Sequence, residues 1–147
     1  MRKIVLIILF CFLPSITFAQ PRIGQLLMQV KHDLSKYPTS STTSSNGDVS
    51  LTVTRFDKKW VETHIFDKHG VCYGCITSPS NEKTANQLMK EYNSKYSYSR
   101  SNNRWIVTDT FSILHLYLSS DNEEDIRMFI HASNSYLNRI VKLLKEK

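Results

Sequence analysis

The chain is poor in the residues that build tight ligand loops and reactive centres. It has four glycines, four prolines and three cysteines among 147 residues. It lacks a Gly-x-Ser-x-Gly elbow, a His-Glu-x-x-His motif and a glycine-rich phosphate loop, so the common serine-hydrolase, zinc-protease and nucleotide-binding templates are excluded. It also lacks an Asn-x-Ser/Thr glycosylation signal, which favours a bacterial protein. We therefore expect no enzymatic activity and no cofactor.

The first nineteen residues have the pattern of a secretory signal peptide. Arg2 and Lys3 precede an apolar run over 4–13, and the stretch ends on the small residue Ala19. The run is shorter than the roughly 20 residues that a membrane helix needs, so we expect cleavage after Ala19 and no transmembrane anchor. The sequence thus predicts an exported protein, periplasmic or extracellular, with a single domain over 20–147.

The charge balance is mildly basic. The whole chain carries +6, and without Arg2 and Lys3 there remain 17 Lys and Arg against 13 Asp and Glu, a net charge of +4. A charge of this size serves solubility and gives a weak attraction to anionic envelope surfaces. Because the cations form no dense stripe, we do not expect nucleic-acid binding.

Three helices are predicted from apolar residues spaced by three and four positions. The first two cover 22–36 and 79–96. A long third helix begins at a capping box over 120–123 and carries an apolar stripe from Ile126 to Leu144. Acidic residues in its first turn and lysines near its end suit the helix dipole.

Alternating apolar residues predict five strands. Three of them form a meander over 49–77, and two form a hairpin over 105–118. The segment 39–48 has only Ser, Thr and turn-forming residues, which predicts a flexible loop. The resulting order, α-βββ-α-ββ-α, indicates an α+β domain with a five-stranded, mainly antiparallel sheet.

This order of elements resembles the type III secretion chaperone-like fold. The likeness is carried by the meander over 49–77, the helix that ends Glu91-Tyr92-Asn93, the hairpin over 105–118 and the C-terminal helix. The resemblance implies a twisted sheet with helices packed on one side and pairing into a homodimer. The familiar chaperones of this fold are cytoplasmic and acidic, whereas this chain is predicted to be exported and is basic. Neither chaperone function nor any functional residue is therefore carried over.

Cys72 and Cys75, separated by two residues, are the sharpest chemical feature of the predicted domain. In an exported protein two cysteines suggest a disulfide, but on a regular strand side chains three apart point to opposite faces. A disulfide therefore needs a bulge or a bend at Gly74. Three interpretations stay open: two cysteines in a regular strand with at least one of them buried, a local disulfide, and a redox-active pair. Nearby His64 and His69 suggest zinc, but without a second paired cluster we predict no metal site.

Tyrosines are interleaved with lysines and arginines at the end of the second predicted helix and beyond it, over 90–104. Their aromatic and basic side chains could contact a partner, a sugar or an anionic polymer by stacking and charge. Burial of the helical tyrosines, with the neighbouring lysines in water, is the alternative. We predict a small exported, non-enzymatic protein that binds an unknown protein or envelope component; a thiol-redox or metal-binding protein that uses Cys72 and Cys75 is the alternative. The predicted contact residues are Tyr92, Tyr96, Tyr98, Arg100 and Arg104.

Overall fold

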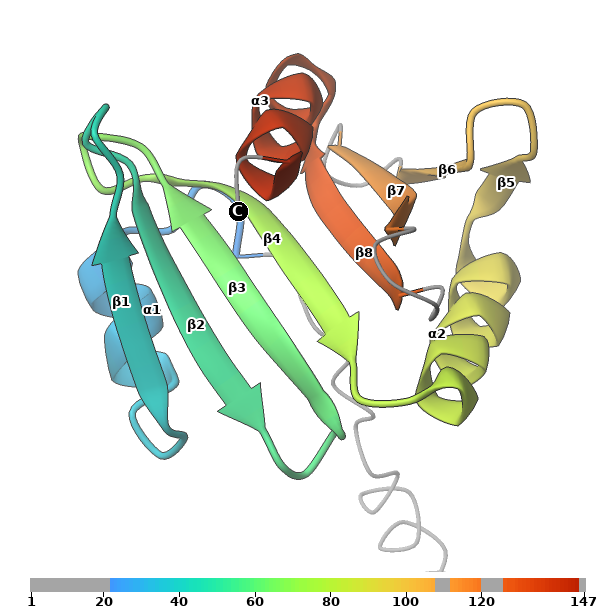
Figure 1. Ribbon diagram of the computed structural model, residues 1–147, viewed down its shortest axis with the longest axis horizontal. Coiled ribbons are helices and arrows are strands. Elements are labelled where there is room, and N and C mark those ends of the chain that lie inside the picture. Colours follow the sequence, from blue (N-terminus) through green and yellow to red (C-terminus); the bar gives the residue numbers. More distant parts are fainter. Residues whose placement is uncertain (1–21, 108–111, 120–125, 146–147) are drawn as a thin grey trace, which may run out of the picture.

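The computed structural model describes residues 22–107, 112–119 and 126–145. These residues form three helices and eight strands (Figure 1). In chain order the elements are α1 (Leu27–Asp33), β1 (Thr39–Thr43), β2 (Val49–Arg55), β3 (Trp60–Phe66), β4 (Cys72–Pro79), α2 (Glu82–Lys95), β5 (Ser97–Ser99), β6 (Arg104–Val107), β7 (Ser112–Ser119), β8 (Ile126–Ser133) and α3 (Asn134–Lys145).

The strands of the described residues form one antiparallel sheet in the order β1-β2-β3-β4-β8-β7-β6-β5. Each half of the sheet has the same plan, a helix followed by four strands: α1 precedes β1 to β4, and α2 precedes β5 to β8. The halves meet at the centre, where Gly74–Thr77 of β4 pairs with Phe129–Ala132 of β8. The C-terminal helix α3 stands outside this repeated plan.

Helices cover both faces of the sheet. Phe129 of β8 packs with Leu88 of α2, whereas the next residue, Ile130, packs with Ile140 of α3. Because successive side chains of a strand point to opposite faces, α2 and α3 lie on opposite faces of the sheet. Figure 1 shows α3 in front of the sheet and α1 behind β1 and β2. We call the front surface the α3 face and the other the α2 face.

A bulge in β4 determines which side chains of this strand face α3. Tyr73 is the extra residue of this strand in its pairing with β3. As a result Tyr73 and Gly74 both face α3, whereas Cys72 and Cys75 both face the α2 side. Gly74 is required here, because a Cβ atom at this position would overlap Cδ1 of Ile140. The glycine therefore lets α3 pack directly against the sheet.

The predicted five-stranded α-βββ-α-ββ-α fold was wrong, although the domain is α+β. Residues 39–43 of the predicted loop are the strand β1, and residues 97–99 are β5. Residues 126–133, predicted as part of the third helix, are β8. This strand lies between β4 and β7 and is covered on both faces, so its apolar residues need not alternate and their spacing imitates a helix. The helices, expected on one side of the sheet, lie on both.

Other boundaries moved less. The meander over 49–77 corresponds to β2, β3 and β4, the last of which runs on to Pro79. The helix α2 lies inside the predicted 79–96. The first helix is shorter than predicted, because backbone groups of Gly24 and Gln25 bond to Cys72 at the start of β4 instead of continuing a helix. The predicted signal peptide and the capping box over 120–123 lie outside the described residues.

Candidate functional site

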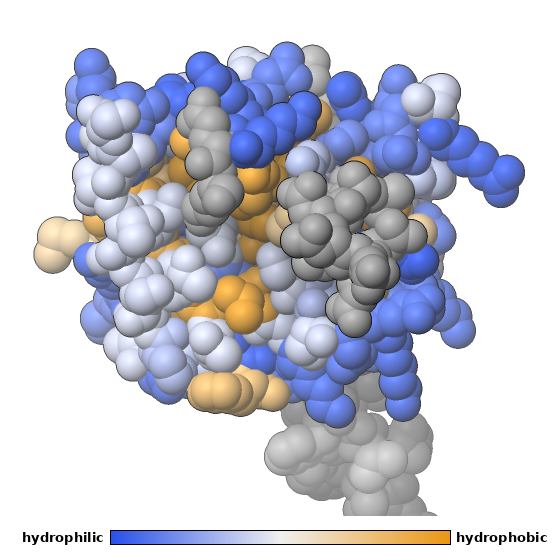
Figure 2. Space-filling model, in the orientation of Figure 1, coloured by the Kyte–Doolittle hydropathy of each residue, from blue (hydrophilic) through white to orange (hydrophobic). Residues whose placement is uncertain are grey.

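A groove of about 210 Å³ lies on the α3 face, between α3 and the half of the sheet that contains β1 to β4. One wall carries hydroxyl groups, from Thr42, Thr43, Ser50 and Thr63. The opposite wall and the floor are apolar, from Ile65, Ile76, Leu143 and Leu144. In Figure 2 this contrast is visible as orange surface at the centre of the molecule beside the pale surface over β1 and β2. We call this feature the α3 groove.

The strand register explains why the groove has two kinds of wall. Thr42 pairs with Ser50, Ser50 pairs with Ile65, and Thr63 pairs with Ile76, so these side chains lie in neighbouring rows on one face. The residues between them on β2 turn to the other face; among them, Leu51 is buried under α1. The hydroxyl wall is therefore the outer face of β1 to β3, and the apolar part begins where α3 covers the sheet.

A buried carboxylate closes one end of the α3 groove. Asp48 exposes only 2% of its surface. Nη2 of Arg139 on α3 donates to both of its oxygens, at 2.7 Å from Oδ1 and 2.6 Å from Oδ2. The hydroxyl of Tyr73 on β4 donates to Oδ2 at 2.8 Å. The Tyr73 ring stacks on Tyr136 of α3, with 4.7 Å between the ring centroids. We call these four residues the Asp48 latch, because they fasten α3 to the sheet.

The latch has a fixed protonation pattern at Tyr73. Burial raises the pKa of the Tyr73 hydroxyl above its ordinary value, and the hydrogen bond to Asp48 raises it further. The hydroxyl therefore remains a donor over the physiological pH range. Asp48 therefore accepts hydrogen bonds from the Tyr73 hydroxyl and from the Arg139 cation at the same time.

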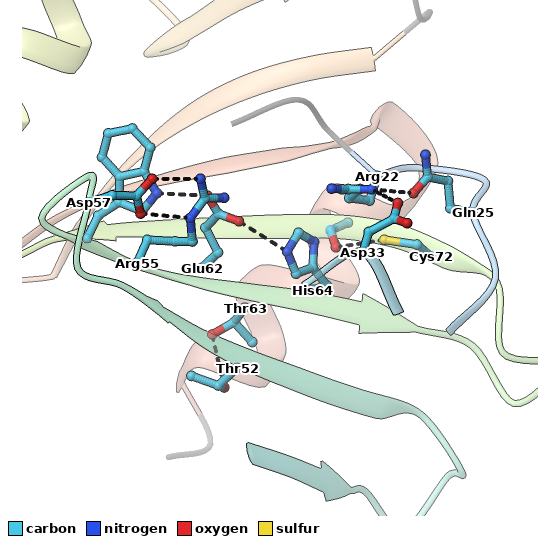
Figure 3. A network of polar contacts seen from close by, with 12 residues as sticks. Arg22, Gln25, Asp33, Thr52, Arg55, Asp57, Glu62, Thr63, His64 and Cys72 are labelled. Atoms are coloured by element: carbon cyan, nitrogen blue, oxygen red, sulfur yellow. Dashed lines mark hydrogen bonds and ion pairs between the residues drawn. The ribbon is translucent and has the colours of Figure 1, made fainter. Parts of the chain in front are cut away.

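A second polar network lies on the α2 face and contains Glu62, which exposes 2% of its surface. Oε1 of Glu62 accepts the Trp60 Nε1–H at 2.8 Å and lies 3.3 Å from Nη1 of Arg55. Nε2 of His64 lies 3.3 Å from Oε2 of Glu62. The two atoms are close enough for an ion pair, but their geometry is not that of a hydrogen bond. Figure 3 shows Arg55, Glu62 and His64 together, with Thr63 and its neighbour Thr52 apart from them. The strands β2 and β3 thus carry separate groups of polar side chains on their two faces.

The Glu62 network acts as a structural element. Burial by itself raises the pKa of the Glu62 carboxyl. The contacts of His64 and Trp60 and the charge of Arg55 together lower this pKa by more, so the net pKa lies below its ordinary value. An ionised carboxylate that is held by these groups serves poorly as a proton-transfer group near neutral pH. We therefore place the candidate site in the α3 groove.

The two cysteines of β4 are free and buried. Burial raises the pKa of the Cys72 thiol to about 11, and burial also raises the pKa of Cys75 well above its ordinary value. Both groups are therefore protonated thiols near neutral pH, and thiolate chemistry is disfavoured. The bulge brings both side chains to one face, which a regular strand would not do.

Of the two histidines considered as zinc ligands, only His64 lies beside a cysteine. His64 is buried on β3 opposite Cys75, whereas His69 is exposed in the turn before β4. In that turn the Asp67 carboxylate accepts the backbone N–H of His69 at 2.9 Å. Within 22–107, 112–119 and 126–145, no group of three or more His, Cys, Asp and Glu side chains is arranged to hold a metal ion.

The structure brings the three predicted contact tyrosines to one cluster, apart from the two predicted contact arginines. Tyr92 is buried in the core with Trp105, and Tyr96 and Tyr98 pack on the same cluster from its edge. Arg100 is exposed in the turn after β5. Arg104 precedes Trp105 on β6 and therefore points to the opposite face.

Comparison of this chain with family models, with curated proteins and with solved structures finds no match. Among the helices that the structure describes, none has the length and apolar character needed to cross a membrane. The assignment of a function therefore depends on the geometry of the site alone.

Sequence reasoning missed the α3 groove. Part of its hydroxyl wall comes from β1, which was predicted as a loop, and its apolar wall comes from a helix that was predicted to begin much earlier. A usable signal was present in β2, where Ser50, Thr52 and Thr54 alternate with Leu51 and Val53. This alternation predicts a strand with one hydroxyl-rich face.

Proposed function

We propose that this chain is a small exported, non-enzymatic binding protein that takes a neutral amphipathic ligand in the α3 groove. The observation that carries the proposal is the contrast between the walls of one groove. The hydroxyls of Ser50 and Thr63 can donate to or accept from hydroxyl and amide groups of a ligand. Ile76 and Leu144 can cover an apolar chain on the other side.

The electrostatics of the groove favour an uncharged ligand. Of the described residues that line it, Asp48 is the only one that ionises. Its charge is neutralised by Arg139 and satisfied by Tyr73. A charged ligand would find no free counter-charge in the lining and would lose its hydration on entry. An envelope component with an apolar chain and a hydroxylated or amide head fits these constraints.

The same arrangement supports a role in binding instead of catalysis. A general base or nucleophile has to be free to exchange a proton with the substrate. Asp48 already accepts hydrogen bonds from Arg139 and Tyr73, and the remaining lining groups are aliphatic side chains and hydroxyls. The thiol or metal alternative gains no support from the described residues, since Cys72 and Cys75 are buried thiols away from the groove.

Binding of octyl glucoside below its micelle concentration tests this proposal. This neutral probe has an apolar tail and a hydroxylated head, and octanoate is its counterpart with a charged head. We expect saturable binding of octyl glucoside by isothermal titration and much weaker binding of octanoate. Equal binding of both probes, or no binding of octyl glucoside, would contradict the proposed ligand class.

A pair of variants locates the binding. Ser50→Phe places a ring in the groove without removing a core side chain, so we expect at least about a tenfold loss of octyl glucoside affinity. Thr54→Phe is the matched control, because Thr54 lies on the same face of β2 but does not line the groove. Equal affinities of the two variants would place the ligand elsewhere.

A further inference from the structure

Among the residues that the structure describes, none pairs with the outer edge of β1. All five residues of β1 are exposed, and β2 is the strand that pairs with it. Strands at the edge of a sheet present unpaired N–H and C=O groups, which can bind another extended strand.

The hydrogen-bond pattern fixes which groups point outward. The Pro38 carbonyl accepts the Thr54 N–H at 3.1 Å, and the Ser44 N–H donates to the Asp48 carbonyl at 2.8 Å. In an antiparallel pair such residues alternate with residues whose N–H and C=O point away from the partner strand. The backbone groups that point outward therefore belong to the odd-numbered residues Thr39, Ser41 and Thr43.

The two edges of the sheet differ in their protection. Natural edge strands are commonly kept from pairing by short length, by charged residues, by proline or by bulges. The edge strand β5 has three residues and lies between Lys95 and Arg100. The edge strand β1 has five residues, Thr-Ser-Ser-Thr-Thr, with no charge and no proline within it. Only β1, of these two, is fit to pair.

We propose that two copies of this chain pair through β1, antiparallel and about a two-fold axis at Ser41. In this register Ser41 pairs with Ser41 of the second copy, and Thr39 pairs with Thr43 in both directions. Each of these pairs joins residues whose backbone groups point outward, so each forms two hydrogen bonds. The dimer extends the eight-stranded sheet of each copy into one continuous sheet.

A second copy fits this edge better than an unrelated strand. The outward groups occur at 39, 41 and 43, so they are symmetric about position 41 and complement themselves. The strand has no charge, so self-pairing brings no like charges together.

The dimer also determines how the two α3 grooves lie. A two-fold axis at an antiparallel strand pair is perpendicular to the sheet, so the faces of both copies match. Both grooves then open on the same side, with Thr42 and Thr43 of each at the joint. The dimer itself does not depend on the proposed function, since its argument uses only the backbone of β1.

Measurement of the solution mass by light scattering over a wide range of protein concentration tests the dimer. We expect wild type to reach twice the mass of the chain. Ser41→Pro removes the central outward N–H and leaves the hydrogen bonds to β2 in place. It should therefore raise the dissociation constant of the dimer by at least about tenfold. Ser41→Ala keeps that N–H and should dimerise as wild type does. A wild type that stays monomeric, or Ser41→Pro that dimerises normally, would overturn the proposal.

Amide hydrogen exchange of the unmodified protein gives a second test that needs no variant to fold. The Ser41 amide should become protected as the protein concentration rises, whereas the Ser40 amide, bonded to β2, should be protected at every concentration. Exchange of Ser41 that does not depend on concentration would overturn the dimer. Octyl glucoside binding by Ser41→Pro should stay unchanged, so failure of the dimer and failure of the groove are distinguishable.

Discussion

The Asp48 latch predicts a large effect of one substitution at a half-exposed position. Arg139→Met removes the guanidinium that donates to both oxygens of Asp48, and methionine keeps much of the aliphatic length. The carboxylate then stays buried with Tyr73 as its principal remaining donor, at 2.8 Å. Asn46 contributes a longer contact at 3.5 Å. The substitution should therefore destabilise the fold, because it leaves the buried charge of Asp48 with too few hydrogen-bond donors.

The structure sets the size of this effect. A hydrogen bond to a charged group contributes about 1.5–3 kcal/mol, and breaking a buried ion pair costs about 3–5 kcal/mol. The Arg139 side chain is 41% exposed, so water screens part of the interaction and can partly replace it. We expect the free energy of unfolding to fall by about 2–3 kcal/mol. Because α3 is loosened, octyl glucoside should also bind more weakly.

Urea unfolding of a double-mutant cycle measures the effect. The cycle contains wild type, Arg139→Met, Asp48→Asn and the double variant, and the two changes should couple by about 2 kcal/mol. Arg100→Met, in the exposed turn after β5, is the matched control and should change stability by less than about 0.5 kcal/mol. If Arg139→Met falls within the range of that control, the latch does not fasten α3 and the account of the groove is wrong.

Three further predictions follow from other buried groups. Burial lowers the pKa of His131 from 6.5 to about 4. Between these two pH values the unfolded chain therefore binds a proton at His131 that the folded chain does not bind. Stability should therefore fall by about 3 kcal/mol as the pH drops through this range, and unfolding of His131→Gln against pH should show a flatter curve. Gly74→Ala should destabilise by about 1–3 kcal/mol in thermal unfolding, because the methyl group overlaps Ile140; stability equal to wild type would refute the close packing of α3. Cys72 and Cys75 should react with a thiol reagent only on unfolding, and fast labelling of the native protein would contradict their burial.

The sequence predicts the elements whose burial is one-sided. On β2, Leu51 and Val53 are buried while Ser50 and Thr52 face the other side, so the strand shows the expected alternation. In α2, Ala85, Leu88 and Tyr92 are buried at helical spacing. Local pattern and tertiary environment agree in these segments, and the predictions there were close.

The sequence misleads where the tertiary environment is symmetric. The central strand β8 is covered by helices on both faces, and its residues Phe129 and Ile130 are both fully buried. Their spacing from Ile126 matches a helix as well as a buried strand. The edge strand β1 is exposed on both faces and so has no apolar residue to reveal it. The groove combines a wall from β1 with a wall from α3, which a reading of local pattern does not bring together.

The most direct test of the binding proposal is a nuclear Overhauser measurement on the protein with octyl glucoside. We predict contacts from the alkyl protons of the probe to the methyl groups of Ile65, Ile76 and Leu144, and from its sugar protons to Ser50 and Thr63. Contacts of the alkyl chain with the α2 face alone, or none to these methyl groups while the probe is bound, would contradict it.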